Sequence, residues 1–166
     1  GGKVIVELDP GLAFGTGTHE TTRLCLEYLD AIEVGGLHVI DYGCGSGILA
    51  IAAALLGAKK VTGIDNDPQA LAATAENAKR NLVEIDTHFP GVALVPSEIV
   101  IANILAQPLM ELAPILIKAM KPDGLLILSG IMSGQADLVV EAYVDQVYLV
   151  NRTELNGWVR LVWKRT

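Results

Sequence analysis

The sequence has few cysteines, no long apolar run and no recognisable leader. Cys25 and Cys44 are the only cysteines among 166 residues, and no C-x-x-C spacing occurs, which argues against a disulfide framework or a zinc site. The longest nearly continuous apolar stretch, residues 48–58, is too short to cross a membrane. No signal-peptide pattern follows the opening Gly1-Gly2-Lys3. We therefore expect a cytoplasmic protein with no membrane attachment.

Basic residues are also scarce. The chain has 12 Lys and Arg against 19 Asp and Glu, a net charge of −7. Binding to nucleic acid through its phosphates needs a basic face, so we expect no direct nucleic-acid contact. The charge is compatible with a basic protein substrate but does not establish one. With 51% hydrophobic residues, the chain is expected to fold as one domain over residues 1–166.

Apolar runs and turn residues predict alternating strands and helices. Strands are expected at 4–8, 37–42, 60–65, 99–102, 125–128, 146–152 and 157–164, and helices at about 19–33, 47–57, 68–81, 108–120 and 134–143. Segment 82–98 is interrupted by Pro90, Gly91 and Pro96 and cannot be assigned. The alternation predicts a doubly wound, mostly parallel α/β sheet. Asn156-Gly157 adds an antiparallel hairpin at the end.

A glycine-rich loop, D-Y-G-C-G-S-G at residues 41–47, follows the strand expected at 37–42. Its three glycines let the backbone approach a ligand closely, beside the N-terminus of the next helix. The dinucleotide fingerprint G-x-G-x-x-G would need a glycine where Ile48 stands. No G-x-x-x-x-G-K-[ST] motif occurs either, which disfavours a nucleoside triphosphatase. The alternative is a tight strand–helix turn without a ligand.

Two acids end neighbouring strands, and they narrow the choice of ligand. Asp65 is placed to accept two hydrogen bonds from ribose hydroxyls, which suits both NAD and S-adenosylmethionine. Asp41 would repel a pyrophosphate but suits a ligand with a cationic amino acid moiety, so S-adenosylmethionine is favoured. Asp67 is explained as a helix cap before Pro68, and no metal is expected.

Several motifs resemble one family. D-Y-G-C-G-S-G and G-I-D-N-D-P resemble the first two motifs of class I S-adenosylmethionine-dependent methyltransferases. Residues 8–22, 102–105, 108–109, 128–131 and 157–162 resemble, in order, the bacterial ribosomal protein L11 methyltransferase family. The resemblance implies a Rossmann-like sheet of seven strands. It also implies S-adenosylmethionine as cofactor and N-methylation of lysine side chains and the N-terminal amine of a ribosomal protein.

The resemblance also implies a set of site residues. Phe14 and Thr16 would belong to a loop over the cofactor, although a flexible connector is the alternative. Asn103 would be catalytic, because its amide oxygen can accept a hydrogen bond from the incoming amine and orient its lone pair. Read alone, Asn103 is more simply a turn residue. The cofactor-binding set is Phe14, Thr16, Thr22, Asp41, Gly43, Gly45, Asp65, Asn66 and Asn103.

The sequence departs from the family pattern in two places. The family carries a separate N-terminal domain that grips the ribosomal protein, and nothing here corresponds to it. A small-molecule methyltransferase, or a cofactor-binding domain without turnover, therefore stays open as an alternative. The second place is segment 82–98, which is short and broken by prolines where the family has a strand and an adenine-contacting turn. An acid among residues 83–86, or Glu98, is a candidate for contacting the adenine, and none of them is favoured. His19, His38 and His88 are interpreted as structural.

Overall fold

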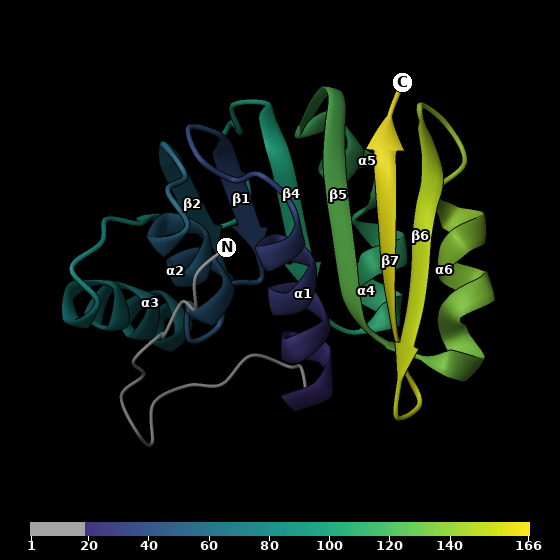
Figure 1. Cartoon of the computed structure of the whole chain (residues 1–166), viewed down its shortest axis with the longest axis horizontal. Coiled ribbons are helices and arrows are strands. Elements are labelled where there is room, and N and C mark those ends of the chain that lie inside the picture. The colour runs from purple at the N-terminus through teal and green to yellow at the C-terminus, as the bar shows by residue number, and fades with distance from the viewer. Residues whose placement is uncertain (1–18) are drawn as a thin grey trace.

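The structure is a computed structural model that describes residues 19–166. The strand expected at 4–8 and the loop with Phe14 and Thr16 lie outside the described residues. Within them, seven strands form one sheet in the order β3-β2-β1-β4-β5-β7-β6 (Figure 1). The strands are β1 (His38–Tyr42), β2 (Lys60–Ile64), β3 (Asp86–His88), β4 (Ser97–Asn103), β5 (Met120–Met132), β6 (Val147–Leu155) and β7 (Trp158–Arg165).

Helices cover both faces of this sheet (Figure 1). They are α1 (His19–Ala31), α2 (Ile48–Leu55), α3 (Pro68–Arg80), α4 (Ala106–Glu111), α5 (Ala113–Lys118) and α6 (Ala136–Ala142), with a 3-10 turn η1 (Ser133–Gln135). Buried side chains from α1 and α2 form one core cluster with the sheet. Those from α4, α5 and α6 form another. Among residues 19–166, no helix is long and apolar enough to span a bilayer.

The pairing directions agree with the prediction from sequence. Strands β3, β2, β1, β4 and β5 pair in parallel, whereas β7 pairs antiparallel with both β5 and β6. Asn156 and Gly157 join β6 to β7 with φ of 51° and 84°, the two positive values that a tight hairpin turn requires. The doubly wound, mostly parallel sheet with a C-terminal hairpin is therefore confirmed.

Two predicted elements differ from the structure, since the strand expected at 125–128 extends over Met120–Met132 and one helix is broken. The single helix expected at 108–120 is two short helices that meet at Leu112. Pro114 explains the break, because proline lacks an N–H and its ring clashes with the carbonyl of residue 110 in a continuous helix. The unassigned segment 82–98 contains β3, which pairs with β2. The polar sequence Asp-Thr-His of this edge strand carries no apolar alternation by which to find it.

A buried arginine fastens α1 to the sheet. Arg160 on β7 is 7% exposed, and its guanidinium donates hydrogen bonds to the carbonyl oxygen of Leu24 at 2.8 Å and to Asn151 Oδ1 at 2.8 Å. The same group lies 4.9 Å from the centre of the Tyr28 ring, close enough for a cation–π interaction. Arg160 thus joins the helix to the two last strands.

We predict that Arg160→Met lowers the free energy of unfolding by about 2 to 3 kcal/mol, because it leaves buried acceptors without their donor. Arg152→Met is the matched control on the same hairpin, since Arg152 makes a surface ion pair with Asp137 that is worth less than about 1 kcal/mol. Urea unfolding followed by circular dichroism measures both. Equal losses in the two variants would contradict the anchoring role of Arg160.

Candidate active site

A cavity of about 440 Å³ lies at the carboxyl ends of the central strands. One wall consists of Gly43 and Gly45 from the glycine loop and of residues 65–67, which follow β2. A second, apolar wall of the lining comes from Ile104, Leu105, Pro108 and Leu112. Four residues predicted for cofactor binding therefore line one cavity, namely Gly43, Gly45, Asp65 and Asn66. Its volume suits a small organic ligand.

The glycine loop lies tightly against the residue that follows Asn103. Gly43 has φ of +81°, and a Cβ atom there would lie 2.5 Å from Ile104 Cγ2. The backbone N–H groups of Gly43 and Cys44 both donate to the carbonyl oxygen of Ile64 at the end of β2. Only glycine combines this φ with the space available, so the packing of Ile104 explains Gly43, and the close approach of a ligand to the loop stays a prediction.

Two buried side chains of α3, which sequence reasoning missed, hold this loop. Thr74 Oγ1 donates to the carbonyl oxygen of Gly45 at 3.0 Å, and Asn77 Nδ2 donates to that of Ser46 at 2.9 Å. A Cβ at Gly47 would lie 3.0 Å from the Thr74 side chain. Thr74 and Asn77 are polar residues three positions apart on the buried side of a helix. That pattern was the available signal, because buried polar groups need partners.

Asp65 connects the end of β2 to the loop. Its Oδ2 accepts a hydrogen bond from the backbone N–H of Gly45, and its Oδ1 accepts one from that of Asp67, both at 3.0 Å. An ionised carboxylate has further acceptor capacity on both oxygens, so Asp65 can still receive hydroxyl donors from a ligand. Asp67 Oδ1 accepts from the N–H of Gln69 at 2.9 Å, so its predicted role as a helix cap is confirmed.

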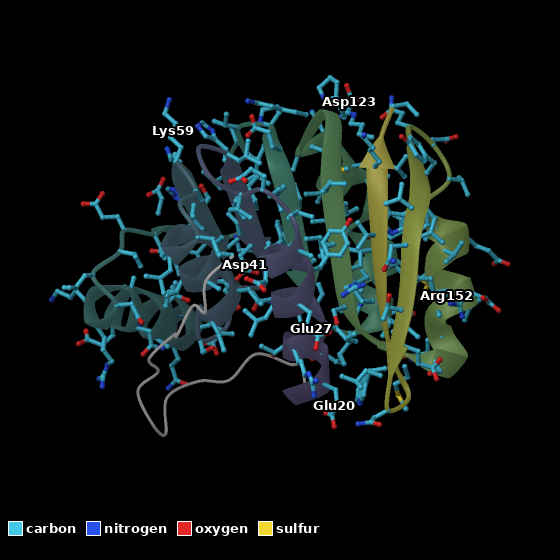
Figure 2. The ribbon with its side chains drawn as sticks, in the orientation of Figure 1. Glu20, Glu27, Asp41, Lys59, Asp123 and Arg152 are labelled. Atoms are coloured by element: carbon cyan, nitrogen blue, oxygen red, sulfur yellow. The ribbon has the colours of Figure 1, made fainter. Side chains whose placement is uncertain are left out.

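Asp41 lies beneath the loop and not among the residues that line the cavity. It is 2% exposed, and its Oδ2 accepts a hydrogen bond from the N–H of Ala50 in α2 at 3.2 Å. Burial raises the pKa of Asp41 to about 7, against the opposing effect of this hydrogen bond, and the nearby Asp65 raises it further. Figure 2 shows Asp41 in the interior of the molecule.

Asn103 meets the start of α1 at the same edge of the sheet. It is the last residue of β4, and its Nδ2 lies 3.5 Å from Thr22 Oγ1 as a hydrogen-bond donor. Figure 2 shows Glu20, in the first turn of α1, at the opposite end of the molecule from Lys59 and Asp123. Thr22 and Asn103 are thus in contact at the carboxyl edge, although neither is among the residues that line the cavity, and their role in cofactor binding stays a prediction.

The other sequence candidates lie elsewhere or outside the described residues. Phe14 and Thr16 belong to the part of the chain that the structure does not describe. Glu98 is bound to Lys121 at 2.9 Å, which holds the pKa of Glu98 down at about 2. Pro90 is the residue of segment 82–98 that lines the cavity. Among residues 19–166 no group of three or more His, Cys, Asp or Glu side chains could hold a metal ion.

Comparison with known proteins gives this site its context. The family model described as ribosomal protein L11 methyltransferase (PrmA) matches residues 1–166. The chain belongs to this family. A ribosomal protein L11 methyltransferase of Methylococcus capsulatus is 55% identical over 166 residues, which cover 98% of the chain and 57% of the relative. The chain therefore spans a little over half the length of this relative of the L11 methyltransferase family.

Solved structures agree with the fold. The ribosomal protein L11 methylase of Lactobacillus delbrueckii subsp. bulgaricus superposes with a TM-score of 0.87 at 36% identity, covering 98% of this chain and 86% of that one. An RNA methyltransferase from Salinibacter ruber, solved in complex with S-adenosyl-L-homocysteine, has a TM-score of 0.68 at 20% identity. It covers 89% of this chain and 92% of that one, and at this identity it supports the fold alone.

The buried Asp41 predicts a pH dependence of stability. An unfolded aspartate loses its proton near about pH 4, whereas folded Asp41 keeps it up to about pH 7. The folded state binds more protons in this window, so its stability falls as pH rises from about 4 to 7 and then levels off.

We predict that Asp41→Asn is as stable as the wild type at about pH 4 and more stable at pH 8, by roughly 2 to 4 kcal/mol. The asparagine oxygen can keep the hydrogen bond from Ala50 without becoming charged. Urea unfolding of both proteins between pH 4 and 8 measures the difference. Parallel curves for the two proteins would show that Asp41 carries no buried charge.

Proposed function

We propose that this chain is the catalytic domain of an S-adenosylmethionine-dependent N-methyltransferase that acts on amino groups of ribosomal protein L11. The observation that carries the proposal is the convergence of the glycine loop, Asp65 and Asn103 on one edge of the sheet. Membership of the family supports it. The whole of residues 1–166 is taken as one cofactor-binding domain, and a ribosomal protein substrate places the reaction in the cytoplasm.

The residues that are present fit this cofactor. Gly43 and Gly45 line the cavity without side chains, so the backbone of the loop is accessible to an extended ligand. Asp65 keeps acceptor capacity for the two hydroxyls of a ribose. Pro90 and the apolar wall formed by Leu105, Pro108 and Leu112 suit a flat aromatic base. When bound, S-adenosylmethionine supplies a methyl group on a positively charged sulfur.

Within this proposal, Asn103 positions the amine of the substrate. A protonated amine has no lone pair with which to attack, and free lysine has a pKa of about 10.4. Desolvation and a nearby positive charge both lower that pKa. The amide oxygen of Asn103 then accepts a hydrogen bond from the neutral amine and directs its lone pair into the cavity. The proton leaves to solvent, so that the catalytic contribution is mainly orientation.

The substrate is inferred from the relatives. Proteins named ribosomal protein L11 methyltransferase in Methylococcus capsulatus and Azotobacter vinelandii are 55% and 52% identical to this chain. We infer that the substrate contacts this domain at the mouth of the cavity, and that the negatively charged chain favours a basic protein over a nucleic acid.

The function is tested in two steps with the chain as it stands. Isothermal titration calorimetry with S-adenosylmethionine is expected to show one site. Transfer of a tritiated methyl group is then measured onto unmethylated ribosomal protein L11. Absence of cofactor binding would refute the whole proposal. Binding with no transfer to L11 would refute the catalytic assignment for this chain and leave a cofactor-binding domain.

Two substitutions separate cofactor binding from transfer. We predict that Asn103→Ala lowers kcat by about 100-fold or more, with the Kd for S-adenosylmethionine changed by less than about threefold. Asp65→Asn is predicted to do the reverse and weaken cofactor binding by about tenfold or more, because it exchanges an ionic acceptor for a neutral one. Calorimetry and the tritium assay measure the two effects. Retained turnover in Asn103→Ala would exclude its catalytic role.

A further inference from the structure

A bulge in β5 lies directly behind the candidate site. In the pairing of β5 with β7, Leu128 is opposite Leu161 and Ile131 is opposite Val159. Ser129 and Gly130 therefore both face the single residue Arg160. A bulge of this kind bends a strand locally and changes the direction of nearby groups. Neither Ser129 nor Gly130 lines the cavity, so binding of a ligand does not explain them.

Gly130 makes room for the backbone that follows Asn103. Its φ is +87°, and a Cβ atom there would lie 2.3 Å from the carbonyl oxygen of Ile104 and 2.9 Å from its carbonyl carbon. The N–H of Ile104 also donates to the carbonyl oxygen of Ser129 at 3.2 Å. The main chain at Ile104, directly after Asn103, thus packs against the bulge. Any side chain at position 130 would push this segment away.

Ser129 holds the other segment that meets Asn103. Its side chain is fully buried, and Oγ donates to the carbonyl oxygen of Thr21 at 3.0 Å. The next residue of α1, Thr22, receives the contact from Asn103 Nδ2. Ser129 is also the register partner of Asn103 across the β4–β5 pair. Ser129 therefore fixes the position of α1, and Gly130 fixes the position of the backbone that follows β4.

We propose that the Ser129-Gly130 bulge is the positioning element of the methyl-transfer site, which fixes Asn103 relative to both α1 and the glycine loop. The inference rests on the proposed function, because it assigns Asn103 the role of orienting the amine. The bulge is connected to the glycine loop by Ile104, because the Ile104 side chain packs where a Cβ of Gly43 would be. Ser129 and Gly130 act through these contacts and do not touch the reacting atoms.

Gly130→Ala tests the bulge, and the hairpin turn supplies a matched control. Gly157 has φ of +84°, almost the same as Gly130, but a Cβ there meets nothing within 4 Å. Gly157→Ala thus adds the same backbone strain without the collision with Ile104. We expect Gly130→Ala to lower kcat by about tenfold or more with the Kd for S-adenosylmethionine within about threefold. Gly157→Ala should keep kcat within about twofold.

Ser129→Ala gives a second test that does not depend on the folding of Gly130→Ala. Its control is Ser97→Ala, because Ser97 is also buried and donates to a backbone carbonyl, that of Val95 at 3.0 Å. Ser97 lies at the start of β4, the other end of the strand from Asn103. We expect kcat to fall in Ser129→Ala and not in Ser97→Ala, with similar melting temperatures. Equal kcat in all four variants, or equal losses in variants and controls, would overturn the proposal.

A spectroscopic measurement separates this proposal from the proposed function. In ¹H–¹⁵N spectra of the chain without substrate, the amide signals of Thr22 and Asn103 should shift in Gly130→Ala and Ser129→Ala but not in the two controls. If the wild type transfers no methyl group, the proposed function fails while these shifts still support the positioning element. Unshifted signals in both bulge variants would overturn the positioning element whatever the activity.

Discussion

Parallel pairing of β1 with a strand on each side is the constraint on which the rest of the site depends. Asp41 is in register with Gly63 of β2 and with Ile101 of β4, so the three strands end together. Parallel strands in such a sheet leave their carboxyl ends at one edge, where the strand order reverses. The glycine loop, Asp65 and Asn103 are far apart in sequence, yet this pairing brings them to one edge of the sheet, where the loop and Asp65 line the cavity and Asn103 directly precedes the lining residue Ile104. The loop is then held in shape because Thr74 and Asn77 of α3 donate hydrogen bonds to its carbonyl groups and Asp65 accepts one from Gly45.

Features that depend on residues close together in the sequence could be predicted from it. The apolar strands, the cap at Asp67 and the hairpin at Asn156-Gly157 were predicted because local chemistry determines each of them. The glycine loop and Asp65 line one cavity because the ends of parallel strands converge, and their binding of a cofactor stays a prediction. Strand β3 was missed, since pairing with β2 and not its own polar residues makes it a strand. Thr74 and Asn77 were missed because their partners are 29 and 31 residues away, and no local pattern specifies that distance.

A charge on Asp41 would favour binding of a cationic ligand but would lower the stability of the folded chain. An ionised carboxylate beneath the glycine loop would favour a cation in the cavity, but its burial beside Asp65 disfavours that charge in the folded chain. The hydrogen bond from Ala50 offsets part of the cost. A ligand with a positive charge would relieve the rest, so the empty domain is less stable than the same fold with such a ligand bound. Perturbed acids of this kind are typical of functional sites.

The contacts of α1 also constrain the order in which the site can be completed during synthesis. Its carbonyl groups are held by Ser129 and Arg160, which are 108 and 136 residues further along the chain. The helix that carries Thr22 therefore leaves the ribosome well before the strands on which it docks. Ser129 is available as an anchor only once β5 is in place, and Arg160 only once β7 has been made. A nascent chain that ends before β5 has neither of these two anchors with which to hold α1, and hence Thr22, beside Asn103.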